Sequence, residues 1–92
     1  MLSPFHLAFP VTNIKQTEQF YGEVLGCSIG RQAERWIDFN FFGHQVSAHL
    51  QDGEAEVIHN PVDGDSVPVP HFGVILPPSE WQALAERIAS HG

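Results

Sequence analysis

Two short apolar runs, each opened by proline and histidine, divide the pattern of hydrophobic positions into two similar halves. Residues 4–11 read Pro-Phe-His-Leu-Ala-Phe-Pro-Val, and residues 70–77 read Pro-His-Phe-Gly-Val-Ile-Leu-Pro. Apolar runs of this length indicate strands, and each run is followed by apolar positions at helical spacing. The pattern therefore predicts a structural unit that is begun twice, each time with a strand and then a helix.

The helix of the first half has recognisable ends. Residues 5–11 form the strand before it, and Thr12 or Asn13 can cap the helix, because a side-chain oxygen at that position accepts a free backbone N–H of the first turn. The apolar positions at helical spacing are Phe20, Tyr21, Val24 and Leu25. Gly26 then supplies the left-handed conformation that ends a helix.

Three further strands are predicted in the first half. They cover residues 27–30, 35–42 and 45–50. Gly43 and His44 are expected to make the tight turn between the last two strands. Residues 1–50 should therefore form a β-α-β-β-β module of an α+β fold.

The rest of the chain is predicted to be a linker and the start of a second module, within a single truncated domain. Residues 51–68 form an acidic linker, because carboxylates alternate there with Gly and Pro without the spacing of a calcium loop. Its carboxylates are Asp52, Glu54, Glu56, Asp63 and Asp65. Residues 69–92 begin the second module with a strand over 69–76 and a helix capped by Ser79. The expected buried stripe of that helix is Trp81, Leu84, Ala85 and Ile88.

Composition and charge exclude several classes of function. The chain has 92 residues, only 4 Lys and Arg, and a net charge of -7. This charge argues against nucleic acid as a partner, since phosphate binding depends on clustered Lys and Arg. No apolar run is long enough to span a membrane and no signal-peptide pattern opens the chain, so we expect a cytoplasmic protein without a membrane partner. Cys27 is the sole cysteine and cannot form an intrachain disulfide.

Three stretches of the chain resemble the vicinal oxygen chelate superfamily of glyoxalases, bleomycin resistance proteins and extradiol dioxygenases. They read His-Leu-Ala-Phe-Pro-Val at 6–11, Phe-Tyr-Gly-Glu-Val-Leu-Gly at 20–26 and Pro-His-Phe-Gly-Val at 70–74. The resemblance implies paired β-α-β-β-β modules whose curled sheets enclose a site. It does not identify the reaction, because one scaffold in this superfamily carries isomerases, dioxygenases and metal-free binding proteins.

The resemblance also implies a metal site formed by the first and last strands of the modules. His6 and His71 match the two first-strand positions. His49 or Ser47 occupies the last-strand region where many relatives carry Glu or Gln, and side-chain alternation places both on one face together with Gln45. The remaining carboxylate of the family site would belong to a part of the second module that this sequence does not include. Two imidazoles and a carboxylate suit a divalent ion such as Fe, Mn, Zn or Ni.

Two functions of different classes follow from these residues. The first is a metal-dependent enzyme, a dioxygenase or a lyase and more dioxygenase-like than glyoxalase-like, which acts on a small oxygen-chelating substrate; the truncated chain itself is expected to be inactive without the second carboxylate. The second is a metal-free binding or sequestration protein of the bleomycin resistance type. The candidate substrate-binding residues are Ser47, Trp36, Phe39 and Arg35, and no catalytic residue is assigned. We also expect a homodimer, because an unpaired apolar strand at 69–76 invites pairing with another chain.

Overall fold

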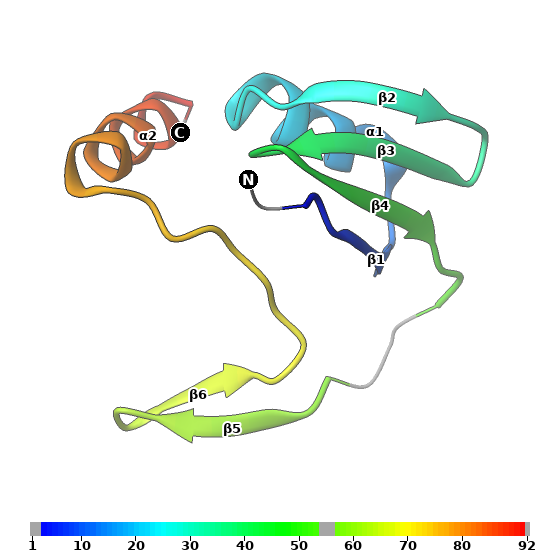
Figure 1. The fold of residues 1–92 in the computed structure, drawn as a ribbon. Coiled ribbons are helices and arrows are strands. Elements are labelled where there is room, and N and C mark those ends of the chain that lie inside the picture. The colour runs from blue at the N-terminus through cyan, green and yellow to red at the C-terminus, as the bar shows by residue number, and fades with distance from the viewer. Residues whose placement is uncertain (1–2, 54–56, 92) are drawn as a thin grey trace.

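The protein, described here from a computed structural model, has the predicted α+β fold. The structure describes residues 3–53 and 57–91. A four-stranded sheet with one helical segment forms the first half of the chain, and a two-stranded hairpin and a second helix form the other half (Figure 1). Glu54 and Glu56 of the predicted acidic linker, like the terminal Gly92, lie outside the described residues.

The first half contains the predicted β-α-β-β-β module. Its strands are β1 (His6–Val11), β2 (Ser28–Gln32), β3 (Trp36–Phe41) and β4 (His44–Leu50). They lie in the order β1-β4-β3-β2, with β1 parallel to β4 and the other neighbours antiparallel. Every predicted strand of this half is confirmed, with ends displaced by no more than about two residues.

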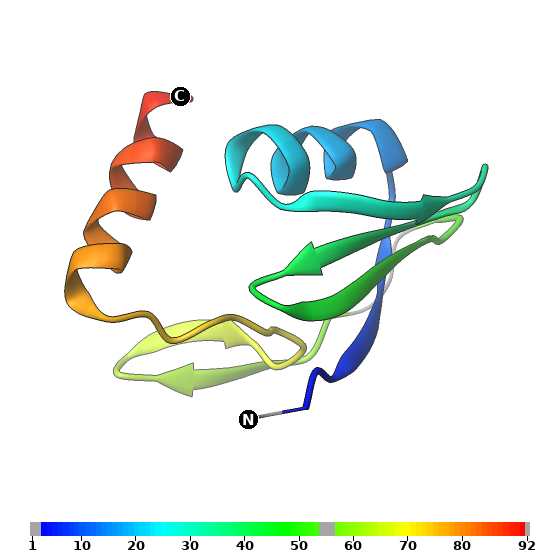
Figure 2. The same cartoon turned by 45° about the horizontal axis from the view of Figure 1, so that its top comes forward.

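The helical segment begins at one of the two predicted caps. Asn13 Oδ1 accepts the backbone N–H of Gln16 at 2.9 Å and so caps α1 (Ile14–Glu18). The segment continues as a π-helical stretch, η1 (Gln19–Val24), and lies across one face of the sheet (Figure 2). Gly26 follows with a φ of 79°, the left-handed conformation that was predicted to end the helix.

The turn between β3 and β4 lies one residue earlier than predicted. Phe42 and Gly43 both have positive φ values, 51° and 89°, which is the signature of a two-residue type I′ turn. The Gly43 N–H also donates to Asn40 Oδ1 at 2.9 Å. His44 therefore begins β4 instead of completing the turn, and its Nδ1 accepts the backbone N–H of Phe5 at 3.0 Å.

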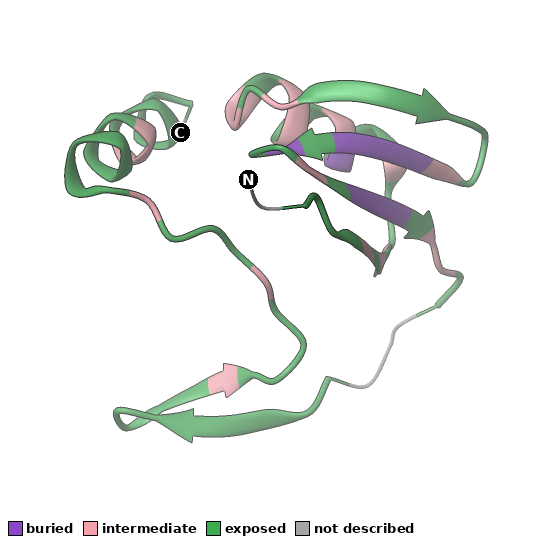
Figure 3. Cartoon of the chain, in the orientation of Figure 1, coloured by how far each residue is buried: buried purple, intermediate pink, exposed green. Residues whose placement is uncertain are grey.

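The hydrophobic core lies between the sheet and the helical segment. Its buried apolar residues are Ile37, Phe39, Phe41, Val46 and Ala48. They come from the two central strands and share one face, because strand side chains alternate. Tyr21 of η1 covers them, with its ring centroid 5.2 Å from that of Phe39. Figure 3 shows that burial is concentrated on β3 and β4.

The predicted acidic linker contains a β-hairpin. Strands β5 (His59–Val62) and β6 (Asp65–Pro68) pair antiparallel. Asp63 and Gly64 between them have φ values of 51° and 87°, as a type I′ turn requires. Asp-Gly between extended residues is a strong hairpin signal. The interpretation of this stretch as a linker was incomplete because it weighed the carboxylates and overlooked the turn.

The strand predicted over residues 69–76 is not formed, which corrects the expectation of a second equivalent strand. Val69 and Pro70 form a bend and the residues after them an irregular segment, with no strand partner among the described residues; the Val69 N–H donates to Ile58 O at 2.6 Å. An apolar run becomes a strand only where another strand satisfies its backbone groups. His71 therefore lies on a connecting segment, whereas His6 lies on a strand.

The second helix, α2 (Pro78–Ser90), forms where it was predicted but is much less buried than expected. Pro77 precedes it and Pro78 occupies its first turn, so Ser79 is not the cap. Within the expected buried stripe, Trp81 is 63% exposed and Ile88 is 38% exposed. Among the described residues, no helix is both long enough and apolar enough to cross a membrane.

Two attachments join this second half to the sheet module. The Phe72 ring lies 4.9 Å from Phe9 and 5.6 Å from Phe41, measured between ring centroids. Arg87 of α2 donates from Nε to Val24 O at 2.7 Å and from Nη2 to Glu23 O at 3.0 Å. The guanidinium therefore satisfies carbonyls at the end of η1 that would otherwise lack partners.

Candidate functional site

The sheet has a second face, opposite the helical segment, which we call the open face. The strand registers arrange its side chains in three rows: His6, Gln45 and Asn40; Ala8, Ser47 and Asp38; Pro10, His49 and Trp36. Each row takes one residue from β1, β4 and β3, and successive rows are two residues apart along every strand. The predicted common face of Gln45, Ser47 and His49 is confirmed.

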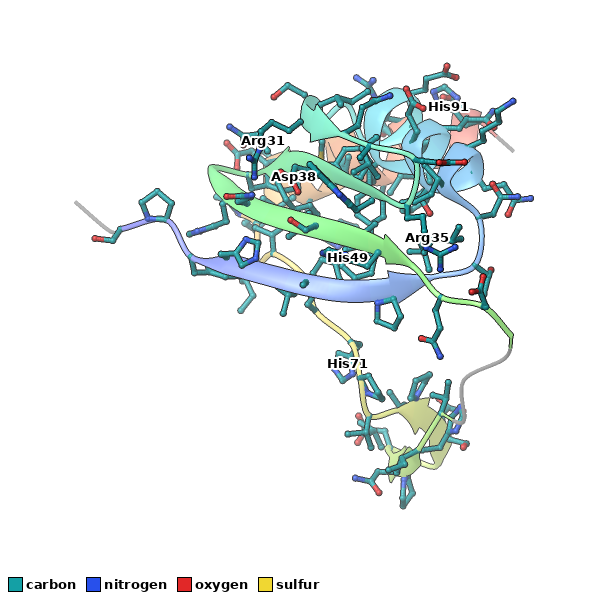
Figure 4. The ribbon with its side chains drawn as sticks, turned by 90° about the vertical axis from the view of Figure 1, so that its right-hand side faces the viewer. Arg31, Arg35, Asp38, His49, His71 and His91 are labelled. Carbon is teal, nitrogen blue, oxygen red and sulfur yellow. The ribbon has the colours of Figure 1, made fainter. Side chains whose placement is uncertain are left out.

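A buried polar pair occupies the middle row. Ser47 Oγ donates to Asp38 Oδ1 at 2.5 Å, and the two residues are 3% and 6% exposed. Arg31 Nε of β2 lies 3.6 Å from Asp38 Oδ2, and Figure 4 shows the two side chains next to each other. Since the hydroxyl proton of Ser47 is used by the carboxylate, the oxygen of Ser47 is left with acceptor capacity.

An aromatic surface adjoins this pair. The Arg31 guanidinium carbon lies 5.5 Å from the Trp36 ring centroid, within the range of a cation–π contact. The side chain of Arg31 is 81% exposed. Only the Arg31 end of the ion pair is exposed, because the Asp38 side chain is 8% exposed. Trp36 thus lies on the open face, as a substrate-binding residue requires.

Two shallow depressions flank the middle row. The first, of about 350 Å³, is lined by Pro4, Gly30, Arg31, Asp38, Phe39, Asn40, Gly43, His44 and Gln45. The second, of about 430 Å³, includes Ala8, Pro10, His49 and Arg35. Gly30 lies close against Asp38, since a Cβ built on Gly30 would be 3.4 Å from Asp38 Cβ. The open face therefore offers broad, shallow space, which suits a molecule lying flat on the sheet.

Phe39, predicted to bind substrate, is a core residue. It is 1% exposed and stacks on Tyr21 on the face covered by the helical segment. Strand alternation explains the difference, because Phe39 points away from the face that its neighbours Asp38 and Asn40 share. That assignment was therefore wrong.

Arg35, another predicted substrate-binding residue, lies at the edge of the second depression. Its Nη2 donates to Leu50 O at 3.1 Å and to Asp52 Oδ2 at 3.2 Å. These bonds hold the end of β4 to the chain that follows it. Arg35 thus has a structural role at the border of the open face, and its part in binding stays a prediction.

The three predicted metal ligands do not meet in the described part of the chain. His6 pairs with Gln45 in the sheet, and His49 lies four residues further along β4, a distance of about 13 Å. Ligand nitrogens of one ion lie only about 2.1 Å from it. His71 is off the sheet, with Nδ1 2.8 Å from Pro68 O (Figure 4). The described residues contain no group of three or more His, Cys, Asp or Glu suited to a metal ion.

Asp38 and Arg31 are the site residues that sequence reasoning missed. Asp38 interrupts an apolar strand, Trp-Ile-Asp-Phe, and a charge within such a run is a recognisable sign of a buried, partnered carboxylate. Arg31 could be associated with it only once the antiparallel pairing of β2 and β3 was known.

Two titratable groups lie on the other face, under the helical segment. Burial raises the pKa of the Cys27 thiol, so the thiol stays protonated and is a poor nucleophile. Burial, followed by the nearby Cys27, raises the pKa of Tyr21. Both groups belong to the packing between helix and sheet.

Comparison with known proteins gives structural relatives. No family model and no curated protein matches the chain. The crystal structure of a glyoxalase/bleomycin resistance protein/dioxygenase from Alicyclobacillus acidocaldarius matches with a TM-score of 0.75 and 29% identity, over 96% of this chain and 62% of that one. An integron cassette protein from the mobile metagenome of a Halifax Harbour sewage outfall matches with a TM-score of 0.73 and 23% identity, over 100% of this chain and 72% of that one. This chain therefore spans less than two thirds of the Alicyclobacillus protein.

Proposed function

We propose that this chain, which has the vicinal oxygen chelate fold of glyoxalases, bleomycin resistance proteins and dioxygenases, binds a small flat molecule on the open face of its sheet. The observation that carries the proposal is the buried Ser47–Asp38 pair between two shallow depressions and beside Trp36. Buried polar groups on a face outside the hydrophobic core are typical of sites that orient a ligand.

The groups on the open face define the chemistry of this ligand. Ser47 Oγ and the Asp38 carboxylate accept hydrogen bonds, so the ligand should carry an N–H or O–H group. The Trp36 ring offers a surface on which an aromatic ring can stack. The net charge of -7 disfavours the approach of an anion. A flat aromatic amine or phenol satisfies all three conditions better than an aromatic carboxylate.

Tryptophan fluorescence tests this proposal. The chain contains two tryptophans, so Trp81→Phe leaves Trp36 as the reporter. This variant is titrated with planar aromatic amines, phenols and carboxylates of similar size. We expect saturable quenching by members of the first two classes and weaker or no binding of the carboxylates. Quenching that rises linearly with every compound would indicate random collisions and contradict a site.

A matched serine pair shows whether the quenching comes from the open face. Ser47→Ala, made in the Trp81→Phe background, removes the central acceptor and should weaken binding by about tenfold, the effect of one hydrogen bond. Ser66→Ala on β6 makes the same chemical change on an exposed strand away from the open face. If both substitutions leave the affinity unchanged, the proposed position of the ligand is wrong.

Metal-dependent catalysis is the second candidate function. It is supported by His6 on the open face and by the structural similarity to the glyoxalase/bleomycin resistance protein/dioxygenase from Alicyclobacillus acidocaldarius. In this proposal His6, His71 and His49 contribute to binding a divalent ion such as Fe, Mn, Zn or Ni. The described structure does not bring these imidazoles together.

Metal analysis separates the two candidates. The untagged protein, His6→Ala and His71→Ala are purified in the same way, and their metal content is measured. An enzyme of the second kind requires a stoichiometric metal in the parent protein that both substitutions remove. Equal metal content in all three proteins would eliminate this candidate and leave ligand binding in place.

A further inference from the structure

An irregularity in strand β2 decides the face to which Arg31 points. The strand is paired with β3 at Ile29 and again at Gln32. Between these positions β2 has two residues, Gly30 and Arg31, where β3 has only Asp38. An extra residue of this kind is a β-bulge, which bends a strand and redirects its side chains. In a regular ladder Arg31 would follow Gly30 to the opposite face. The bulge therefore explains why Arg31 reaches Asp38 on the open face.

Arg31 occupies the position on the open face where a cationic ligand group would bind. Its Nε lies 3.6 Å from Asp38 Oδ2, and its guanidinium carbon lies 5.5 Å from the Trp36 ring centroid. A carboxylate and an aromatic ring face are the groups that proteins use to hold cations. A ligand ammonium or amidinium group would seek the same two partners. Because like charges repel strongly at such short distances, Arg31 and a ligand cation cannot share this position.

The carboxylate at this position is largely shielded from water. The Asp38 side chain is 8% exposed, whereas that of Arg31 is 81% exposed. Ser47 donates to the other carboxylate oxygen, Asp38 Oδ1. A buried carboxylate that loses its cation partner is in an unfavourable state. Without Arg31, the Asp38 carboxylate should therefore attract a cation from a bound molecule.

The overall charge of the chain and the local charge of Arg31 act on opposite classes of molecule. The net charge of -7 attracts cations and repels anions at long range. At the open face Arg31 repels cations, but its guanidinium is attracted to the face of a neutral aromatic ring. Neutral aromatic molecules are therefore the class that neither charge disfavours.

We propose that Arg31 determines the specificity of the open face: by occupying the cation position beside Asp38 and Trp36, it excludes aromatic cations and restricts the ligand to neutral molecules. This inference rests on the proposed function, because it concerns the ligand of the same face. It also narrows the class of that ligand, since the net charge alone disfavours only anions.

Two planar compounds of the same shape test this role. Benzamidine is a cation at neutral pH and benzamide is uncharged, and both carry N–H groups next to an aromatic ring. Their affinities are measured by Trp36 fluorescence in the Trp81→Phe background. The protein that retains Arg31 should bind benzamide more tightly than benzamidine. Arg31→Gln should raise the affinity for benzamidine relative to benzamide by about tenfold or more, the effect of one charge-assisted hydrogen bond.

Lys15→Gln is the matched control. It removes the same charge from an exposed residue of α1, which lies across the other face of the sheet (Figure 2). It should leave the ratio of the two affinities nearly unchanged. Arg31→Lys keeps the positive charge and should keep the preference for benzamide. Because both substituted side chains are exposed, all variants should retain the circular dichroism spectrum of the parent protein.

A double substitution identifies the group that holds the ligand cation. Asp38→Asn keeps an acceptor for Ser47 but removes the carboxylate charge. In this background Arg31→Gln should no longer raise the ratio of the benzamidine and benzamide affinities. A gain that persists without the carboxylate would overturn the proposal, because Arg31 would then not act through the position at Asp38.

The remaining outcomes separate this inference from the proposed function. The protein with Arg31 in place gives a result that no effect of substitution on folding can alter, and tighter binding of benzamidine than of benzamide there would overturn the inference. Equal ratios in the parent protein, Arg31→Gln and Lys15→Gln would also overturn it. In either case, saturable binding of aromatic amines or phenols would leave the proposed function in place. If no aromatic compound binds saturably, both the proposed function and the role of Arg31 are wrong.

Discussion

Asp38 is a buried residue of the open face that accepts a hydrogen bond from Ser47 and lies next to Arg31. Asp38→Asn keeps the size of the side chain but removes its charge, and so weakens its interaction with Arg31 and with any ligand N–H group. We expect the affinity for an aromatic amine and for a phenol, both uncharged near pH 7, to fall by about tenfold, because an amide oxygen accepts a hydrogen bond more weakly than a carboxylate does. Trp36 fluorescence titrations of both compounds measure the change. Unchanged affinity for both would show that the Asp38 carboxylate has no part in recognition.

Burial of Tyr21 should make the free energy of unfolding fall at alkaline pH. Its pKa is raised above 10.0 by burial, so the folded protein holds the phenol proton more tightly than the unfolded chain does. The resulting stability is fully present below pH 10 and is lost as the pH rises through the folded pKa. In a Cys27→Ser background, which removes the other raised group, the free energy of unfolding should fall above pH 10. Tyr21→Phe should make this fall in the free energy of unfolding smaller. Urea unfolding of both proteins from pH 8 to 11 measures the difference. If the free energy of unfolding falls equally in both, Tyr21 is not the source of the pH dependence.

Single residues were predictable where alternation alone decides their orientation. Gln45, Ser47 and His49 were placed correctly on one face because they lie two apart on a strand. Phe39 was misassigned because it was chosen for its aromatic ring alone. As the neighbour of Asp38 on a strand, it points to the opposite face of the sheet. The Ser47–Asp38 bond depends on the register between β3 and β4, which no local pattern specifies.

At the scale of elements, Arg87 connects α2 to the end of η1 beside Gly26. A Cβ on Gly26 would lie 3.1 Å from the Arg87 guanidinium, and φ there is 79°. Gly26→Ala should therefore combine backbone strain with displacement of Arg87, at a total of about 1–3 kcal/mol. Gly43→Ala is the matched control, since φ is 89° and nothing lies within 4 Å of the added Cβ. Urea unfolding should show the larger loss for Gly26→Ala.

A double substitution tests the cause of that difference. In an Arg87→Ala background the guanidinium is absent, so Gly26→Ala should cost about as much as Gly43→Ala. If the difference between the two glycine substitutions persists without Arg87, the contact between α2 and η1 does not cause it.

A helix or strand was predicted correctly where its local sequence pattern is matched by a neighbouring element that pairs or packs with it. The helix cap at Asn13 and the strands of the first module combine local patterns with neighbours that complete the sheet. The hairpin at Asp63 and Gly64 had a local signal that was overlooked. Residues 69–76 had the apolar pattern of a strand, but the described chain supplies no neighbouring strand for them.

At the scale of the whole molecule, the chain consists of one packed module and a second half that is anchored but little buried. The module was predicted correctly, because its five elements complete one sheet and one core. The prediction that His6 and His71 occupy matching strand positions was wrong, because only His6 lies on a strand. The candidate site proposed above is therefore the open face of one sheet, and the second half contributes no side chain to its three rows.

The position of a bound ligand is the most direct test of this account, and the two tryptophan indole N–H groups can report it. In ¹⁵N-labelled protein they give two signals, which Trp81→Phe assigns. Planar aromatic amines and phenols are added one at a time. The account predicts that binding compounds shift the Trp36 signal progressively and saturably while the Trp81 signal stays in place. Saturable shifts of the Trp81 signal alone, or a Trp36 signal that no compound moves, would contradict a binding site on the open face.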